Sequence, residues 1–324
     1  MLTFKEAQQI INEHLAKLKL TGEPPELYEP IRYILSIGGK RMRPVLVLMS
    51  CSLYTDSVEH AVRPALGIEV FHNFTLLHDD IMDQSVVRRN HPTVNKKWND
   101  NVAILSGDAM SILSYKYIAK CPEDQLKDVL DLFNETALEV CEGQQYDLNF
   151  EEEMEVSVND YLRMIELKTS VLVAASLKLG AILGKAPDED RRQLYDFGRN
   201  LGIAFQIRDD YLDTYGDPEK FGKRIGNDIV TNKKTYLMIT ALELAKGKHR
   251  DELNQLLKNR ETDPEEKVKA VKRIYNQLDV GNIARSKAEQ YYERALQCLQ
   301  KLSVDPSKKE ALISFASELM ERES

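Results

Sequence analysis

The sequence predicts an all-α protein, a helical bundle of about 12 helices. Apolar residues recur at helical spacing along almost the whole chain, and no run with the period of two that marks a strand stands out. The 324 residues include only 15 glycines and 11 prolines, too few for the turns that many short strands would need.

Turn formers and charges bound the predicted helices. Gly38 and Gly39 follow one helix, Pro122 follows another, and acidic residues at 188–190 open a third. The predicted helices cover residues 4–19, 25–37, 42–54, 58–82, 100–119, 124–149, 157–184, 188–214, 232–258, 265–278, 280–301 and 306–322.

Two stretches, residues 67–77 and 171–183, are apolar on more than one helical face, which places them at the centre of the expected bundle. No shift in composition marks a linker, so residues 1–324 are expected to form a single domain. The irregular stretch at 215–232 is rich in Gly, Asp and Lys, and a loop of that length in a compact helical domain is often functional.

Composition limits the function. Lys and Arg number 44 against 52 Asp and Glu, so the net charge of −8 disfavours nucleic acid as a partner. The most apolar stretch, residues 171–184, is interrupted by Lys178 and is too short to span a bilayer, and the N-terminus lacks the apolar core of a secretory signal. Four cysteines without metal-binding spacing are expected as free, buried thiols. We expect a soluble, cytoplasmic protein without stable membrane insertion.

Two acidic motifs of equal spacing lie near the ends of apolar predicted helices. Asp79, Asp80 and Asp83 form the first, while Asp209 and Asp213 bound the second. Residues four apart share a helix face, with carboxylates about 6 Å apart. Either motif alone could be explained as the solvent-exposed end of a helix. Two such clusters that face each other would form an all-oxygen site for a hard cation. Magnesium fits best, because it combines carboxylates with water and substrate phosphates.

Basic residues accompany the acidic motifs in an otherwise acidic chain. They are Lys40 and Arg43 after the glycine turn, Arg88 and Arg89 after the first motif, Lys168 inside an apolar helix, and Lys223, Lys233 and Lys234 around the irregular stretch. Cations together with magnesium suit a polyphosphate ligand. The glycine patterns of P-loop and dinucleotide-binding sites do not occur, which disfavours a nucleotide.

Seven short motifs follow one another between residues 38 and 237. They are GGKRMRP, LLHDDIMD followed by RR and PT, SGD at 106–108, GQQYD at 143–147, KT at 168–169, FQIRDDYLD, and GKRIGNDIVTNKKTY. In this order they resemble the motifs of trans-isoprenyl diphosphate synthases of the polyprenyl synthetase family. The resemblance implies the isoprenoid synthase type of bundle, in which the helices surround a central cavity.

The resemblance implies a head-to-tail condensation of isopentenyl diphosphate with an allylic diphosphate (dimethylallyl, geranyl or farnesyl). The allylic C–O bond ionises, the carbocation alkylates the double bond of isopentenyl diphosphate, and a proton is lost, with released pyrophosphate as the implied acceptor. Metal ions and fixed cations stabilise such a leaving group. The resemblance further implies three Mg²⁺ ions per active site, Mn²⁺ as a substitute, and a homodimer.

The resemblance also assigns roles to individual residues. The implied magnesium ligands are Asp79, Asp83, Asp209 and Asp213, with Asp80 between the first two. The implied contacts to isopentenyl diphosphate are Lys40, Arg43, His72 and Arg89. The implied contacts to the allylic diphosphate are Arg88, Lys168, Thr169, Gln206, Lys223 and Lys233, with Thr169 near the reacting carbons. The residues expected to act in catalysis are Asp79, Asp80, Asp83, Asp209, Lys168 and Thr169.

His72 lies seven residues before Asp79, about two helical turns away on the same face, which supports its role. The remaining ring-bearing candidates, His78, Trp98, Tyr146 and Tyr291, are expected to be structural.

Two positions depart from the family pattern, because Asn90 and Asn227 stand where glycine is frequent. Asparagine adopts a positive φ more readily than most residues, so both turns are expected to persist.

The resemblance places the floor that limits product length upstream of the first motif. Phe74 lies five residues before Asp79, about 7.5 Å along the helix, with Thr75 beside it and Phe71 about one turn deeper. One aromatic residue here, without an insertion in the motif, resembles geranylgeranyl (C20) synthases. We therefore expect a short-chain all-trans product, C20 first and C15 next.

Other functions remain open at this point. A terpene cyclase would share the fold but usually lacks the second acidic motif and cations such as Lys40 and Arg43. A non-catalytic partner subunit of a heteromeric prenyl synthase tends to lose an acidic motif. A phosphohydrolase of the HD type needs several His-Asp pairs, and His78 with Asp79 supplies only one.

Overall fold

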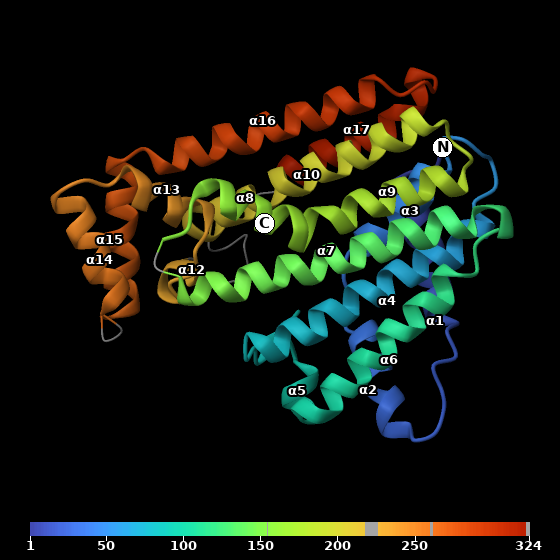
Figure 1. Ribbon diagram of the computed structural model, residues 1–324, viewed down its shortest axis with the longest axis horizontal. Helices are drawn as coiled ribbons and strands as arrows, with labels where there is room; N and C mark the ends of the chain where they lie inside the picture. The colour runs from blue at the N-terminus through green and yellow to red at the C-terminus, as the bar shows by residue number, and fades with distance from the viewer. Residues whose placement is uncertain (154, 218–225, 260–261, 322–324) are drawn as a thin grey trace. The chain divides into compact units, whose positions relative to one another are not determined.

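The computed structural model describes residues 1–153, 155–217, 226–259 and 262–321. Helices make up almost all of its regular structure (Figure 1). The sheet content of these residues is a single antiparallel pair of two-residue strands. The predicted all-α fold class is confirmed.

The chain divides into two compact units, each described by itself below. Unit 1 comprises residues 1–134, 175–194 and 303–311, and unit 2 comprises residues 135–174, 195–302 and 312–324. Both units are built from separated segments, and the expectation of a single domain over residues 1–324 stays a prediction. The helices that contribute residues to both units are α7 (Leu126–Glu152), α9 (Val171–Leu183), α10 (Asp188–Tyr215) and α17 (Pro306–Glu321).

Unit 1 is organised around α4 (Glu59–Met82), which packs mainly against α6 (Asp100–Ile118) and α3 (Met42–Cys51). Gly67 permits the close approach of α6, because a Cβ there would lie 2.9 Å from the carbonyl oxygen of Ser114. From Ala61 to Phe71 every residue of α4 except Arg63 is buried, as its apolar faces predict. The other elements of unit 1 are α1 (Phe4–Ala16), α2 (Pro25–Ser36), β1 (Val87–Arg88), β2 (His91–Pro92), α5 (Val94–Lys97) and η1 (Glu123–Gln125).

Unit 2 has α13 (Tyr236–Leu244) among its most buried elements, in contact with α8 (Val158–Ile165), α15 (Pro264–Gln277) and α16 (Val280–Gln300). Every residue of α13 from Tyr236 to Ala241 is buried. The other elements wholly within unit 2 are the π-helical segment η2 (Glu166–Ser170), α12 (Asn227–Val230) and α14 (Lys248–Lys258).

Two predicted helices are interrupted. The helix predicted over 157–184 is α8, the π-helical segment η2 and α9 in succession. Gly143 of α7 contacts η2 so closely that a Cβ would lie 2.2 Å from the backbone nitrogen of Lys168. The helix predicted over 232–258 begins at Tyr236 and breaks between α13 and α14, where Gly247 has a φ of 51°.

The β1–β2 hairpin and α5 were not expected from the sequence, because strands of two residues are too short to show a period of two. Arg89 and Asn90 form its turn with φ angles of 52° and 62°, so the expected tolerance of asparagine is confirmed at Asn90. At Asn227 the expectation is wrong. Asn227 lies in α12, and the positive φ of 80° falls on the preceding Gly226.

Among the described helices, none combines the length and apolar character needed to cross a membrane. The four cysteines are free thiols, but only Cys51 and Cys298 are buried, whereas Cys141 is exposed. The expectation that all four are buried is therefore wrong.

Candidate functional site

The first acidic motif lies at the end of α4, where the β1–β2 hairpin brings Arg88 against it. Arg88 Nε donates to both carboxylate oxygens of Asp80 at 2.9 Å, and Arg88 Nη2 lies 3.3 Å from Asp79 Oδ2. The backbone N–H of Ser85 donates to the Asp80 carbonyl at 2.9 Å, which fixes the start of the hairpin. Asp80 is therefore the structural anchor of Arg88.

The three acids of this motif differ in exposure. Asp80 is only 2% exposed, whereas Asp79 is partly exposed and Asp83 at the helix C-cap is exposed. Burial raises the pKa of Asp80, and the Arg88 guanidinium opposes that rise. Asp79 and Asp83 are thus better placed than Asp80 to meet a metal ion and a phosphate.

A buried ion pair joins the glycine turn to α4. Gly38 and Gly39 have φ angles of 87° and 130°, and Arg41 has a φ of 53° before α3. Arg41 Nη1 lies 2.7 Å from Glu69 Oε1, and both side chains are almost fully buried. Asn73 Nδ2 donates to the same Glu69 oxygen at 2.9 Å.

Sequence reasoning missed Arg41, Glu69 and Asn73. The available signal was a glutamate and an asparagine inside an apolar helix, since buried polar groups need partners.

Arg43 and His72 form the second contact between the glycine turn and α4. Arg43 Nη1 donates to His72 Nε2 at 3.1 Å, which requires a neutral imidazole with an unprotonated Nε2. Burial and then the Arg43 charge hold the pKa of His72 well below its ordinary value, and Arg89, Arg88 and Arg41 act in the same direction. Burial lowers the pKa of Arg43 to about 10, with Glu69 opposing. His72 is therefore a neutral acceptor within reach of four arginines.

Arg89 lies against the same glycine turn of unit 1. Its guanidinium donates to the carbonyl of Gly38 and lies over Gly39, where a Cβ would be 2.6 Å from Nη1. Lys40 is exposed in the same turn, and its carbonyl accepts from Gln8 at 2.8 Å. Lys40, Arg43, His72 and Arg89 thus gather as one basic corner on unit 1.

The second acidic motif, in unit 2, is built differently. Asp210 is 5% exposed and accepts hydrogen bonds from the Tyr161 hydroxyl and from the backbone N–H of Tyr236, the latter at 2.9 Å. Gln206 Nε2 donates to its other oxygen at 3.3 Å. Burial raises the pKa of Asp210 to about 7, although the bonds from Tyr161 and Tyr236 act against the rise.

The outer acids of the second motif are partly exposed. Asp213 Oδ2 accepts from the backbone N–H of Asp228 at 3.1 Å, and the Asp213 carbonyl accepts from Gly226 at 2.6 Å. Asp213 therefore holds the start of α12, while Asp209 lies four residues earlier on the same face of α10.

Acids that sequence reasoning did not name as site residues act on two cations of unit 2. Lys168 Nζ lies 2.5 Å from Asp147 Oδ2. Burial opposes the charge of Lys233, but Asp228 and Asp147 outweigh burial, and the pKa of Lys233 is raised. Asp147 belongs to the quoted GQQYD motif, which was the available signal. Thr169 follows Lys168 in the π-helical segment and is partly exposed, and Lys223 lies outside the described residues.

The residues predicted to limit product length form a row of rings in unit 1. The Phe74 ring centroid lies 5.5 Å from that of Phe71 and 4.7 Å from that of His78. Phe71 is buried against Phe133 at 5.2 Å, whereas Phe74 is partly exposed. The Thr75 hydroxyl donates to the carbonyl of His72.

The donor chemistry of both motifs fits magnesium. Each motif offers partly exposed carboxylate oxygens, which are ligands of the kind that magnesium prefers. Within the described part of the chain, no group of three or more His, Cys, Asp or Glu side chains forms a ready-made metal site. Magnesium keeps waters and takes substrate phosphates in place of a closed protein cage, so carboxylates of this kind suit it.

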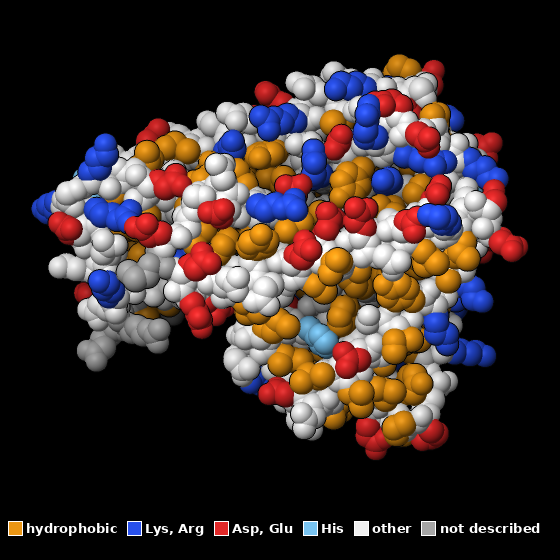
Figure 2. All heavy atoms as spheres, in the orientation of Figure 1, with side chains coloured by type: hydrophobic (Ala, Val, Ile, Leu, Met, Phe, Trp, Pro, Cys, Tyr) orange, Lys and Arg blue, Asp and Glu red, His pale blue; other side chains and the backbone are white. Residues whose placement is uncertain are grey.

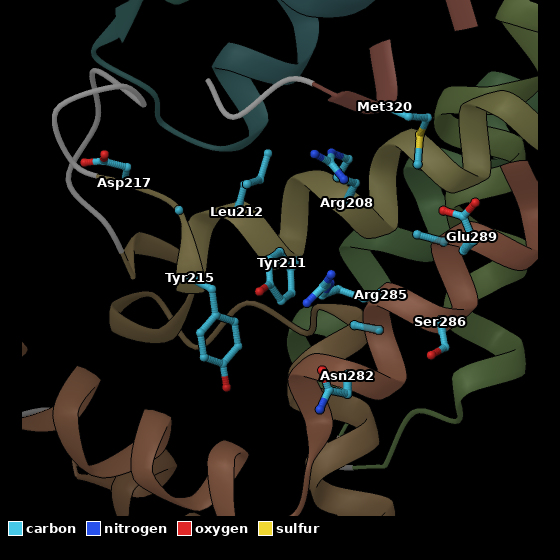
Figure 3. A pocket seen from close by; sticks show the side chains of 13 residues that line it. Arg208, Tyr211, Leu212, Tyr215, Asp217, Asn282, Arg285, Ser286, Glu289 and Met320 are labelled. Atoms are coloured by element: carbon cyan, nitrogen blue, oxygen red, sulfur yellow. The ribbon is translucent and has the colours of Figure 1, made fainter. Parts of the chain in front are cut away.

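A cavity of about 730 Å³ in unit 2 lies apart from these acids (Figure 3). It is bounded by α10, α16 and Met320 of α17, and Arg208, Tyr211 and Tyr215 line it from α10. These α10 residues alternate at helical spacing with Asp209 and Asp213 and occupy another face of the helix. None of the predicted site residues lines this cavity.

Comparison with known proteins gives consistent similarities. The model of the family described as Polyprenyl synthetase matches residues 24–277, which include both acidic motifs. The chain is 36% identical over 305 residues to the geranylgeranyl diphosphate synthase of Sulfolobus acidocaldarius, covering 93% of this chain and 91% of that protein. It is 36% identical over 307 residues to the geranylfarnesyl diphosphate synthase of Aeropyrum pernix, covering 92% and 95%.

Solved structures agree. A crystal structure of a geranylgeranyl pyrophosphate synthase superposes with a TM-score of 0.94 at 44% identity, over 100% of both chains. The geranylgeranyl pyrophosphate synthetase of Pyrococcus horikoshii Ot3 gives a TM-score of 0.92 at 34% identity, over 98% of both chains.

Proposed function

Because the chain belongs to the polyprenyl synthetase family, we propose that it is a prenyltransferase that condenses isopentenyl diphosphate head to tail with an allylic diphosphate. The products are pyrophosphate and a short-chain all-trans prenyl diphosphate. The observation that carries the proposal is the combination of two acidic motifs with the basic corner of unit 1. That combination supports a synthase over a terpene cyclase, which has no need of a second diphosphate site.

The basic corner would hold isopentenyl diphosphate. Arg43 and Arg89 are fixed by His72 and by the Gly38 carbonyl, and Lys40 stands exposed beside them. Cations held in place before the substrate arrives bind a diphosphate without the cost of reorganisation. The neutral His72 accepts from Arg43, so it orients that guanidinium and adds no charge of its own.

The acidic motifs and nearby cations would hold the allylic diphosphate. Asp79, Asp83, Asp209 and Asp213 are the proposed magnesium ligands, and bound Mg²⁺ supplies Lewis-acid stabilisation of the leaving pyrophosphate. We propose three ions per site, with Mn²⁺ as a substitute. Arg88 and Lys168 add positive charge that is fixed by a carboxylate of their own unit, and Lys233 adds a charge that Asp228 and Asp147 favour. Thr169, Gln206 and Lys223 complete the proposed set.

Phe74 would set the length of the product. The Phe71 and Phe74 rings stand upstream of Asp79 on α4, on the path of a chain that grows away from the metal ions. Geranylgeranyl synthases among the relatives support a C20 product, with C15 as the second candidate.

Replacing Phe74 by alanine should lengthen the product by at least one isoprene unit. The measurement is chromatography of products made from farnesyl diphosphate and labelled isopentenyl diphosphate. An unchanged product length would show that Phe74 does not limit the length of the product.

A second copy of the chain is the proposed partner. Large apolar side chains on α6 are exposed, with Leu105 at 61% and Ile112 at 65%, and hydrophobic side chains gather on this part of unit 1 (Figure 2). Leu105 and Ile112 are seven residues apart and share a helix face, together with Ile104 and Tyr115. A patch of this kind marks an interface more often than open surface. We propose a cytoplasmic homodimer, and a Leu105→Glu/Ile112→Glu variant should sediment as a monomer.

Pyrophosphate release tests the reaction against its alternatives. With Mg²⁺ and both substrates, a synthase releases pyrophosphate and elongates the allylic chain. A terpene cyclase would release it from the allylic substrate alone, and a non-catalytic subunit would release none under either condition.

A further inference from the structure

A cavity of about 670 Å³ in unit 1 is lined by residues of the α1–α2 connection, α2, α4 and the C-terminal end of α6. Its volume is in the range of small-molecule sites. It contains none of the residues proposed for the reaction. Arg63 on its wall precedes Asp79 on α4 by sixteen residues, about 24 Å along the helix axis.

Four cations line this basic pocket. Lys19 comes from the α1–α2 connection, Arg63 from α4, and Lys116 and Lys120 from the end of α6. No Asp or Glu of the described chain lines the pocket, and none of these cations is in an ion pair with a described residue. In a chain of net charge −8, four unneutralised cations around one cavity form a strong local anion-attracting field.

Helix electrostatics explain only part of this arrangement. Lys116 lies in the last turn of α6 and Lys120 just beyond it, where cations complement the negative end of a helix. Lys19 and Arg63 belong to other elements and have no such reason to gather there. Their convergence on one cavity therefore favours a ligand over simple helix capping.

The remainder of the pocket is apolar. Leu20 is 6% exposed, and Tyr28, Leu113 and Tyr117 pack against the same core cluster. Burial raises the pKa of Tyr117 and the charge of Arg63 opposes that rise, so the cationic wall lies near the tyrosine hydroxyl. A ligand that fits this pocket has an anionic end and an apolar body.

We propose that the basic pocket binds a phosphorylated amphiphile, with its phosphate or diphosphate among Lys19, Arg63, Lys116 and Lys120 and its apolar chain on Leu20, Leu113 and the tyrosine rings. Binding needs no metal ion, because no carboxylate lines the pocket. Two sources share this chemistry, a soluble prenyl diphosphate and the head group of an anionic phospholipid. The site is separate from the one that the proposed reaction uses.

Calorimetric titration with geranyl diphosphate in EDTA tests the soluble source. A Lys116→Glu/Lys120→Glu variant should lose one binding site per chain, or weaken it at least about tenfold. The matched control is Lys246→Glu/Lys301→Glu, which makes the same charge change at exposed lysines outside the pocket and should bind as the wild type does. Inorganic pyrophosphate should bind the pocket more weakly than geranyl diphosphate, because it has no apolar part.

Vesicle flotation tests the membrane source, with phosphatidylcholine vesicles that contain or lack about 30% phosphatidylglycerol. If the pocket variant loses binding to anionic vesicles but keeps binding to geranyl diphosphate, the ligand is a phospholipid head group. If it loses binding to geranyl diphosphate but keeps binding to anionic vesicles, the ligand is a soluble prenyl diphosphate. If neither probe separates the pocket variant from its matched control, the proposal is wrong. Circular dichroism and condensation activity, both expected unchanged in the pocket variant, separate this outcome from misfolding and from failure of the proposed function.

Discussion

The two acidic motifs have the same spacing, yet their central acids are stabilised in different ways. In unit 1, Asp80 is paired with the Arg88 guanidinium at 2.9 Å. In unit 2, Asp210 is held by neutral donors, the Tyr161 hydroxyl and the Tyr236 backbone N–H, and its pKa rises to about 7. The same spacing of aspartates therefore contains one central acid that is paired with a guanidinium and another that is held by neutral donors.

The outer and central acids of each motif have different roles. The outer acids of both motifs are the more exposed and suit metal binding, whereas the central acids are buried and tie neighbouring segments to the motif. Unit 1 balances buried charge with arginine, at Asp80 and also at Glu69. At Asp210, unit 2 instead uses a tyrosine hydroxyl and a backbone N–H as donors.

Outer acids should behave alike in both motifs, and this is the largest expected effect. Asp79→Asn and Asp209→Asn should each lower kcat about 1000-fold, because a metal ligand and its stabilisation of the leaving group are lost. Steady-state assays with Mg²⁺ measure this, and Asp56→Asn at an exposed position is the control. Near-normal turnover in either variant would show that the two motifs are not equivalent in catalysis.

Central acids should differ in their effect on stability. Asp80→Asn should lower the free energy of unfolding by about 3 kcal/mol, because the partly buried Arg88 loses its buried carboxylate partner and keeps only the 3.3 Å contact with Asp79. Asp210→Asn should cost only about 1 kcal/mol, since an amide oxygen still accepts from Tyr161 and Tyr236. Urea unfolding measures both free energies. Equal losses in the two variants would show that the two central acids are not stabilised in different ways.

The arginine-rich corner of unit 1 should make stability depend on pH through His72. The pKa of His72 is well below its unfolded value, so below about pH 6.5 the unfolded chain binds a proton that the folded chain does not. The free energy of unfolding should therefore fall by about 1 kcal/mol per pH unit as the pH drops from 6.5 to 5. In His72→Gln this component should vanish, and an identical slope in both proteins would contradict it.

Tyr161→Phe tests the neutral donors of unit 2 and has the smallest expected effect. Losing one hydrogen bond to Asp210 should lower the free energy of unfolding by about 1 kcal/mol. Urea unfolding should show this loss and an unchanged transition slope. A loss as large as that of Asp80→Asn would mean that Asp210 is charged in the folded protein.

Much of the fold followed from the sequence, because each long helix has a continuous apolar face that sets its period. The π-helical segment at 166–170 could not be predicted from the sequence, because it packs against Gly143 of another helix. Hydrophobic periodicity gives no information on contacts between helices. The break at Gly247 was missed, although the glycine and the run of polar residues at 248–252 that follows it were visible in the sequence.

For the site, the motifs identified the residues but not their partners. Lys40, Arg43, His72 and Arg89 were named and do gather, through contacts from three separate segments. Arg41 with Glu69, and Asp147 with Lys168, were not named as pairs, because a pair requires knowledge of which helices touch. The difference between Asp80 and Asp210 could not be predicted either, since both occupy the same place in the motif.

Product analysis tests the proposed activity most directly. The wild-type protein is incubated with Mg²⁺, labelled isopentenyl diphosphate and dimethylallyl, geranyl or farnesyl diphosphate in turn, and the dephosphorylated products are separated by chromatography. We predict a labelled all-trans C20 alcohol from each starter, lost when EDTA replaces Mg²⁺ and lost in Asp79→Asn. If label never enters a longer chain while the protein is folded and Mg²⁺ is present, the chain is not a prenyl diphosphate synthase.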